Sequence, residues 1–488
     1  MKQTQKTMLT SGVLVLVASG LGAYAVFGVQ KPEEQKEAAK TKADTVFDGF
    51  DKEHVKALEV KAKGSDVQLM KDGKDWKVTS PVKADADVDV VNALLAKLGE
   101  LKRKSTVDEK PADLAKFGLA PPKVSVTATL DDGKKLELAI GEDNGFDSSV
   151  YFKRGDLAQV DAGESSLKAP LEKNLFDLRD KRLVHVDDAD VKGLAVKLGQ
   201  AAYTLERGAD GKWTIALPVK ERADSAAADR LLSQLKNARA TSVAAESASG
   251  AELAKFGLDK PRGVVTLTVG DKAVKTFAFG VNKTGTTAHD YVQVNGAGPV
   301  LEVEASLSSQ FEKPLFELRD KLVATFDKDA VKRVAIELAG QDTIEYTRTK
   351  PASPDGGYVE EQFAIVKPHA AEAKKWKCSG ALYALSNLRA AAFVDEHADA
   401  KALARFGLDK PARTYTVYGD ADKVLARIKV GKLEGTRYFV QEGGSTRVDA
   451  VEKATVDDLP KSLDDLVEKP AEKAAAPSAP FVPPPIKG

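Results

Sequence analysis

A nine-residue segment that occurs three times constrains the fold of this chain more than any other feature. Its copies read Leu114-Ala-Lys-Phe-Gly-Leu-Ala-Pro-Pro122, Leu253-Ala-Lys-Phe-Gly-Leu-Asp-Lys-Pro261 and Leu403-Ala-Arg-Phe-Gly-Leu-Asp-Lys-Pro411. A helical turn runs into Gly, which adopts the left-handed conformation that ends helices, and the following Pro prevents continuation. We call this segment the joint and predict a structural role for it, with Phe in the domain core. Its defining residues are Phe117, Gly118, Leu119, Phe256, Gly257, Leu258, Phe406, Gly407 and Leu408.

The joints belong to three longer copies that share further elements in the same order. Val191 in the second copy corresponds to Val331 in the third, which gives a period of 140 residues. Each copy has a hairpin with an aromatic residue in its second strand, an amphipathic helix, the joint, and alternating strands, one of which ends in Gly. A period of domain size indicates tandem domains rather than the turns of a solenoid.

These elements predict an α+β fold: an N-terminal transmembrane helix followed by three tandem homologous domains. Each domain is expected to be a mainly antiparallel sheet with one long and one or two short helices. The predicted parts are a membrane anchor (1–29), a spacer (30–45), repeat domains at 46–184, 185–324 and 325–469, the last divergent, and a Pro-rich disordered tail (470–488).

Two nearly identical segments close the first two copies. They read Leu175-Phe-Asp-Leu-Arg-Asp-Lys181 and Leu315-Phe-Glu-Leu-Arg-Asp-Lys321, whereas the third copy has diverged at this place. No Gly/Ser-rich or Pro-rich linker follows either segment, so we expect little freedom between successive domains. The predicted inter-domain residues are Phe176, Arg179, Phe316 and Arg319. For the two arginines an inter-domain ion pair is favoured over a ligand contact, with a modest energy if it is exposed.

The amino terminus carries an apolar run without charge from Met8 to Val29. At 1.5 Å per residue this run can cross a hydrocarbon core of about 30 Å. The alternative is a cleaved signal peptide, because Ala23-Tyr-Ala25 has the form of a cleavage site. We expect the anchor, and with it a single-pass protein of the bacterial inner membrane, attached through residues 8–29 with its body in the periplasm. A count of flanking lysines leaves the orientation open.

The order of these elements resembles the bacterial domain-of-unknown-function family 4340. The resemblance rests on the Trp-bearing hairpin, the Phe-Gly-Leu-x-x-Pro joint, the strand that ends in Gly, the aromatic strand and the Leu-Arg-Asp closing segment, and it covers most of residues 46–466. It implies a single-pass envelope protein, an accessory partner of an ABC-type transport system of the gliding-motility kind. No activity and no catalytic residue comes with the resemblance.

Charge and residue usage exclude several classes of function. Lys plus Arg and Asp plus Glu both number 73, so no global charge favours nucleic acid. The five histidines never lie three or four residues apart, and no Cys cluster exists, so we predict no metal site, cofactor or catalytic residue. Cys378 falls on the buried stripe of its predicted helix and is expected to be a core thiol.

Two classes of function remain open from the sequence. The favoured one is a non-enzymatic envelope scaffold that binds a protein partner in the envelope, with no small-molecule substrate inferred, because the repeated joint comes with no polar constellation. The alternative is an envelope hydrolase whose site is assembled from residues distant in sequence. Convergent polar side chains in one cleft would support the hydrolase.

Overall fold

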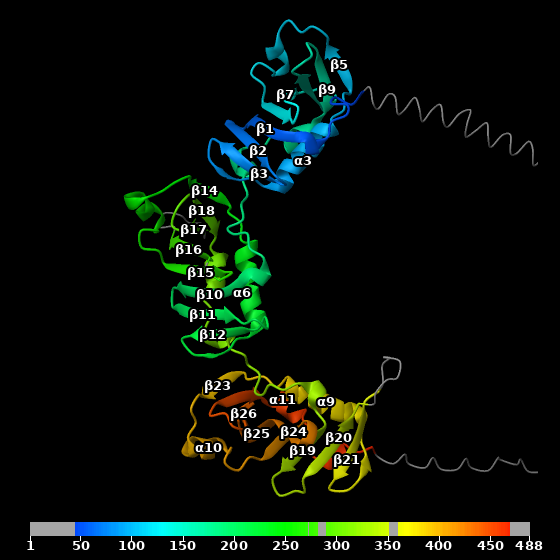
Figure 1. The fold of residues 1–488 in the computed structure, drawn as a ribbon, viewed down its shortest axis with the longest axis vertical. Helices are drawn as coiled ribbons and strands as arrows, with labels where there is room; N and C mark the ends of the chain where they lie inside the picture. The colour runs from blue at the N-terminus through cyan, green and yellow to red at the C-terminus, as the bar shows by residue number, and fades with distance from the viewer. Residues whose placement is uncertain (1–43, 272, 282–288, 351–359, 469–488) are drawn as a thin grey trace, which may run out of the picture. The chain divides into compact units, whose positions relative to one another are not determined.

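The computed structural model describes residues 44–271, 273–281, 289–350 and 360–468 (Figure 1). The predicted membrane anchor, most of the spacer and the Pro-rich tail lie outside the described residues. Among the described residues, no helix combines the length and the apolar character that crossing a bilayer requires. The chain forms two compact units, Met1–Val191 with Leu232–Phe311 and Lys192–Leu231 with Glu312–Gly488.

The described chain contains three nine-stranded sheets, one for each copy of the repeat. In the first sheet the strand order is β4-β3-β2-β1-β6-β7-β8-β9-β5, and the other two sheets repeat this order. Neighbouring strands pair antiparallel, as in β1 with β6 and in β19 with β24. The predicted tandem, mainly antiparallel domains are therefore confirmed.

The strands have the following bounds. The first sheet contains β1 Val55–Ala62, β2 Ser65–Asp72, β3 Asp75–Ser80, β4 Ala84–Asp85, β5 Ser105–Asp108, β6 Val124–Leu130, β7 Lys135–Asp143, β8 Ser149–Arg154 and β9 Val160–Glu164. The second contains β10 Val191–Leu198, β11 Ala201–Arg207, β12 Trp213–Leu217, β13 Glu221–Arg222, β14 Ser242–Ala245, β15 Gly263–Val269, β16 Ala273–Val281, β17 His289–Val294 and β18 Val300–Glu304. The third contains β19 Arg333–Leu338, β20 Ile344–Thr349, β21 Gln362–Lys367, β22 Ala371–Glu372, β23 Ala392–Asp395, β24 Arg413–Tyr418, β25 Val424–Glu434, β26 Arg437–Glu442 and β27 Val448–Glu452.

Helices are few and mostly short. The α-helices are α3 Val88–Gly99, α4 Lys168–Leu171, α5 Leu175–Leu178, α6 Ser225–Asn237, α7 Ser306–Phe311, α8 Leu315–Leu318, α9 Lys375–Ser386, α10 Ala400–Phe406 and α11 Lys453–Asp457. The 3₁₀ turns are η2 Lys52–His54, η3 Leu114–Phe117, η4 Ser165–Leu167, η5 Asp188–Asp190, η6 Gly250–Phe256, η7 Lys328–Ala330, η8 Asp420–Asp422 and η9 Leu463–Asp465. Each copy has one long helix, namely α3, α6 or α9.

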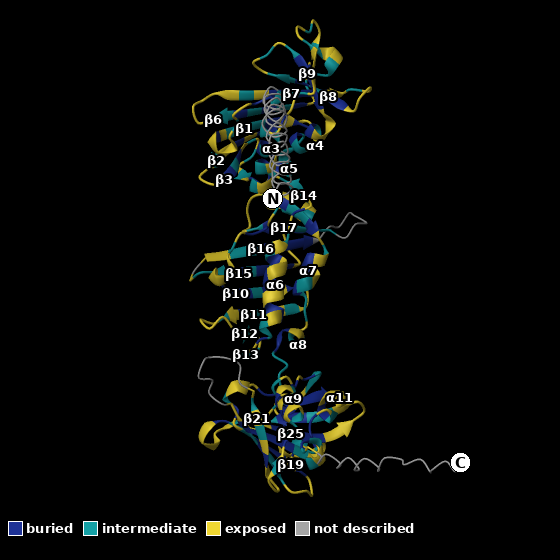
Figure 2. Ribbon diagram, turned by 90° about the vertical axis from the view of Figure 1, so that its right-hand side faces the viewer, coloured by how far each residue is buried: buried dark blue, intermediate teal, exposed yellow. Residues whose placement is uncertain are grey.

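The first long helix, α3, begins and packs as its sequence pattern indicates. Asp87 caps α3, because its carboxylate accepts the backbone N–H of Val90 at 3.2 Å. The apolar positions of α3 are buried in the same core as Trp76 of β3. In Figure 2 the buried positions lie in the strands, and the long helix α6 turns exposed positions outward. Apolar residues alternate along the strands and recur at helical spacing in the long helix. Each element therefore has one apolar face, and these faces pack together into one core.

Cys378 lies on α9 and is fully buried, as its place on the apolar stripe predicts. Its neighbours in the core include Tyr346, whose hydroxyl donates to the carbonyl of Cys378 itself at 3.2 Å. Burial raises the pKa of the thiol to about 12. A thiol that remains protonated at physiological pH is a poor nucleophile, so Cys378 is a packing residue.

The joint has the backbone conformation that its sequence predicts. Gly118, Gly257 and Gly407 have φ values of 66°, 64° and 70°, in the left-handed region that favours Gly. The strand-ending Gly has a separate cause, since a Cβ on Gly141 would lie 2.0 Å from the carbonyl oxygen of Phe117. A Cβ on Gly280 would lie at the same distance from the carbonyl oxygen of Phe256. The joint thus lies directly against the strand that follows it.

The joint phenylalanines correct part of the prediction. Phe406 is buried, but it lies in a small cluster with Leu408, separate from the main core of the third copy. Phe117 and Phe256 are only half-buried, so they are not core residues as predicted. Each of these two contacts one tyrosine edge-on, Tyr151 at 5.2 Å and Tyr291 at 5.0 Å between ring centroids. The leucine that follows the joint Gly is buried in all three copies, as Leu119, Leu258 and Leu408.

Candidate functional site

The closing segments hold their arginines in the same backbone setting. Arg179 is the C-terminal cap residue of α5, and Arg319 is that of α8. Each arginine then forms an antiparallel bridge, Arg179 with Ala86 and Arg319 with Ala223. In α5 this geometry is supported by Asn174, which forms a reciprocal capping box at the start of the helix. Both arginine side chains are buried, with 7% and 9% of their surfaces exposed.

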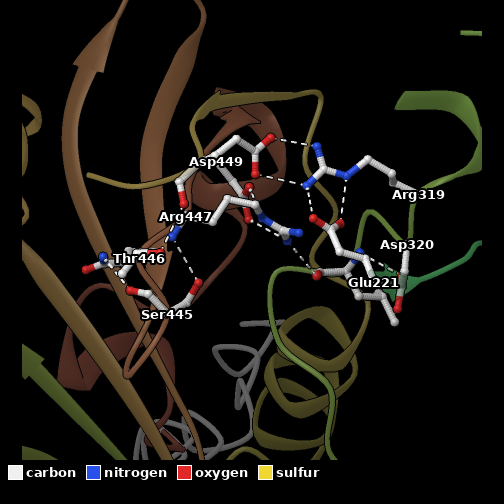
Figure 3. Close-up of polar contacts among 10 residues, drawn as sticks. Glu221, Arg319, Asp320, Ser445, Thr446, Arg447 and Asp449 are labelled. Atoms are coloured by element: carbon white, nitrogen blue, oxygen red, sulfur yellow. Dashed lines mark hydrogen bonds and ion pairs between the residues drawn. The ribbon is translucent and has the colours of Figure 1, made fainter. Parts of the chain in front are cut away.

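Arg319 binds two carboxylates in the second unit (Figure 3). Its Nε and Nη2 donate to Glu221 of β13, both at 2.7 Å. Its Nη1 and Nη2 donate to Glu396 at 2.6 and 2.9 Å. Hydrogen bonds to Glu396 are the largest cause of the raised pKa of Arg319, and the same bonds lower the pKa of Glu396. Each nitrogen of this guanidinium therefore donates to a carboxylate, the arrangement in which a buried arginine is well compensated.

An aromatic ring completes this cluster. The Phe393 ring of β23 lies under two guanidinium groups, that of Arg319 at 4.1 Å and that of Arg447 at 4.3 Å from the ring centroid. Phe316, one of the predicted inter-domain residues, meets the same ring edge-on at 4.9 Å. Cation–π contacts of this kind are worth more where water is excluded. The ring therefore stabilises two neighbouring cations.

Asp449 is the buried carboxylate of the cluster, and 2% of its side chain is exposed. Its oxygens accept from Arg447 Nε at 2.8 Å and Nη2 at 3.2 Å. Burial raises the pKa of Asp449 to about 6, although Arg447 and Arg319 favour the charged form. A raised carboxylate pKa is typical of catalytic acids, but here both oxygens already belong to an ion pair.

Arg179 has fewer partners than Arg319. In the first unit its Nη2 donates to Glu246 at 2.6 Å. Its Nε and Nη1 are buried without a hydrogen-bond partner among the described residues. Phe176, the other residue predicted at this junction, lies under the ammonium of Lys181 at 5.1 Å. Two orphaned donors on a buried guanidinium are unusual, because each costs about 1–3 kcal/mol when it is left unpaired.

Arg179 lines a hollow of about 760 Å³ in the first unit. The wall is mixed in charge and includes Ala84, Asp180, Arg182, His185 and Glu246. Asp180 is already engaged, since its carboxylate accepts from Arg182 and lies 2.7 Å from His185 Nε2. This hollow, which Arg179 lines, is our candidate functional site, and the two unpaired donors of Arg179 are themselves enclosed by protein.

Sequence reasoning missed the carboxylates that bind the two arginines. Glu246 and Glu396 each follow the edge strand of their copy, β14 or β23, and the two edge strands have the same register against β18 and β27. In the sequence, the only feature that these two residues share is a Glu directly after a short strand. In a chain with so many charged residues, that feature is too common to identify a site. Among the described residues, no group of three or more His, Cys, Asp or Glu side chains could hold a metal ion.

Comparison with known families agrees with this architecture. A family model described as Domain of unknown function (DUF4340) matches residues 76–249, 213–362 and 364–475. The chain belongs to this family. The three matched regions cover most of the chain and confirm the repeat that the joints predict. No curated protein matches the chain.

Proposed function

We propose that this DUF4340 protein is a non-enzymatic, membrane-anchored envelope protein that acts as a scaffold or binding partner. The observation that carries the proposal is the use of its repeated charged residues. Arg179 and Arg319 each bind a Glu of the following copy, within a single compact unit in both cases. Equivalent residues that link successive copies support a protein in which repetition multiplies binding surface.

The hydrolase alternative would draw its strongest support from Asp449, whose raised pKa suits a general acid. Its carboxylate oxygens are bound by Arg447, and Arg447 Nη2 also donates to the carbonyl of Leu322 at 3.4 Å. This ion pair serves a folding role, and a catalytic acid would need a free oxygen facing a substrate. We therefore favour the scaffold.

In this proposal residues 8–29 anchor the protein in the inner membrane and the body lies in the periplasm. The apolar run supports the anchor, and the signal-like charge layout before it supports export. The family resemblance adds the partner to test first, an ABC-type transport system of the gliding-motility kind.

Fractionation and protease accessibility test the location. We expect the full chain in the inner-membrane fraction and its body to be digested by protease added to intact spheroplasts. A cytoplasmic protein serves as the protected control. A body that stays protected, or a wholly soluble protein, contradicts the proposed location.

Capture of partners after crosslinking in whole cells tests the scaffold. We expect subunits of an envelope transport system to be enriched with the full chain. They should be lost from a variant in which the apolar run Met8 to Val29 is replaced by a cleavable signal peptide. Equal recovery from both forms would contradict a partner that is met at the membrane.

A further inference from the structure

We propose that Arg179 and the hollow it lines bind a carboxylate group, which the guanidinium receives on its unoccupied edge. This inference goes beyond the proposed scaffold function, and it departs from the expectation that the protein has no small-molecule ligand. It rests on the orphaned donors of Arg179, on an internal comparison between copies, and on the space beside the guanidinium.

The orphaned donors come first. The Arg179 side chain is 7% exposed, and only its Nη2 is bound, by Glu246 at 2.6 Å. Nε and Nη1 have no hydrogen-bond partner among the described residues. A guanidinium remains charged in proteins and offers five N–H donors, so unbound donors in a buried position favour an acceptor from outside the chain.

The second copy shows what such an acceptor is. There the Nε edge of Arg319 is held by Glu221, with both contacts at 2.7 Å. Glu221 pairs with Ile215 in the sheet of the second copy, and Ala84 pairs with Val78 at the same register in the first copy. The residue that supplies a carboxylate to Arg319 is therefore replaced by Ala84 beside Arg179.

The third copy provides the complementary case. Its bridge from Ala373 ends on Val467, where the bridges from Ala86 and Ala223 end on arginines. Ala371, which pairs with Ile365, occupies the position of Glu221. The third copy thus lacks both the arginine and the carboxylate, the second has both, and the first keeps the arginine alone. Loss of the carboxylate with retention of a buried arginine indicates a site rather than decay of the contact.

The space beside Arg179 fits a ligand. The hollow has a volume of about 760 Å³, and Ala84 lies in its wall. Its wall contains five basic residues and four acidic ones, namely Lys77, Lys83, Arg179, Arg182 and Lys275 against Asp75, Asp85, Asp180 and Glu246. Three of the acidic groups pair with cations of the wall, Asp85 with Lys77 at 2.6 Å, Asp180 with Arg182 at 2.9 Å and Glu246 with Arg179 at 2.6 Å. Lys83 and Lys275 outnumber the remaining Asp75, and this excess of positive charge favours an anion.

The geometry selects a planar carboxylate. Nε and Nη2 of a guanidinium form a fork that matches two carboxylate oxygens, and Glu221 uses this fork on Arg319. On Arg179 the same fork consists of Nε and the N–H of Nη2 that Glu246 does not take. The carboxylate can come from a free small acid or from an Asp or Glu side chain of a protein. Both sources share the chemistry that Arg179 recognises.

Calorimetric titration of the detergent-solubilised full chain, at low salt, tests the inference. The two probes are succinate, a free dicarboxylate, and an acetylated and amidated Ala-Glu-Ala tripeptide, which presents one side-chain carboxylate. We expect saturable binding of at least one probe at one site per chain. Binding of succinate alone assigns a free small acid, and binding of the peptide alone assigns a protein side chain.

Substitutions locate the site. Ala84→Glu places the Glu221 carboxylate in the first copy, and we expect it to lower affinity at least tenfold while Arg179 is retained. Ala84→Gln has the same size without the charge and should lower affinity less. Arg179→Met should abolish binding. Arg437→Met, which removes an exposed arginine that pairs with Glu452, should bind as the wild type does.

Two results would overturn the proposal. The first is the absence of saturable binding of either probe to the wild-type chain. The second is an affinity in Ala84→Glu equal to that of the wild type, which would place the bound carboxylate elsewhere. Because Ala84→Glu adds a counter-charge and removes nothing, a thermal unfolding temperature at or above that of the wild type confirms that the variant is folded.

Discussion

The closing arginine of the first unit and that of the second occupy the same place in the fold but have different partners. Arg319 is held by Glu221, Glu396 and the Phe393 ring, whereas Arg179 is held by Glu246 through one hydrogen bond. The same α-helical turn and the same bridge position both residues. The fold therefore places both arginines alike, and their partners decide whether the arginine is a structural contact or a site with unpaired donors.

The joints differ between the units in the same direction. Phe406 in the second unit is buried, and its ring contacts Phe439 with 4.6 Å between centroids. Phe256 in the first unit is half-buried and contacts Tyr291. The joint phenylalanine is thus more fully enclosed in the second unit, and the closing arginine has more partners there. Four substitution experiments can break or sharpen this contrast.

The largest effect is expected at the joint. Phe406→Ala should lower the free energy of unfolding of the second unit by about 3–4 kcal/mol, because it removes a buried ring and leaves a cavity. Phe256→Ala should cost about 1–2 kcal/mol, since this ring is less buried than that of Phe406. Hydrogen exchange of the β26 and β17 amides measures each effect locally, which suits a chain of several domains. Equal costs would show that the two joints are equally enclosed and would remove this part of the contrast.

The pH dependence of the second unit is the next effect in size. The folded-state pKa of Asp449 is about 6, above its ordinary value of 3.8. The folded protein therefore binds a proton that the unfolded chain has released between these values, and stability should decrease as pH rises from about 4 to 6. The difference between these two pKa values corresponds to a loss of about 3 kcal/mol in the free energy of unfolding at most.

Asp449→Asn should remove this pH-dependent step, measured as exchange protection of β27 across pH 4 to 7. Asp161 is the matched control, because it has the same register on β9 that Asp449 has on β27. If the pH-dependent loss of stability persists in Asp449→Asn but disappears in Asp161→Asn, then Asp161 of the first unit causes it, and the prediction is contradicted.

Substitution of the two arginines should give a smaller difference in the free energy of unfolding between the two units. Arg319→Met should cost about 2 kcal/mol, less than a fully buried ion pair, because the side chains of Glu221 and Glu396 are 30% and 43% exposed. Arg179→Met should cost less than about 1 kcal/mol, since it removes one hydrogen bond together with two unpaired donors. The two variants can be compared by their urea unfolding midpoints, measured from the hydrogen exchange of the β13 and β4 amides. A larger loss at Arg179 would mean that its orphaned donors are compensated by water.

The smallest effect is expected from completing the first site. Ala84→Glu should stabilise the first unit by about 1 kcal/mol through a charge-assisted pair with Arg179, discounted for solvent at the rim of the hollow. The reverse change, Glu221→Ala, should destabilise the second unit by a similar amount. Thermal unfolding of both variants at low and high salt checks the sign. Destabilisation by Ala84→Glu would show that the two sites are not equivalent in geometry.

Sequence reasoning predicted the parts of the fold that depend on local chemistry. The left-handed Gly of the joint and the buried stripe that includes Cys378 both follow from residues a few positions apart. The repeat itself is a property of the sequence, and the family match confirms it. The strand-ending Gly141 was recognised as a pattern, but its cause, the close approach of the Phe117 carbonyl, needed the structure.

The candidate site could not be predicted in the same way, because its contacts join residues far apart in the chain. Arg179 and Glu246 are 67 positions apart, and Arg319 and Glu221 are 98 apart. Sequence alone determined that two arginines occur at equivalent places. Only the tertiary structure decided that these arginines are buried, because burial and pairing depend on which strands lie beside the closing helix, and the charge pattern of a solvated surface looks the same in sequence.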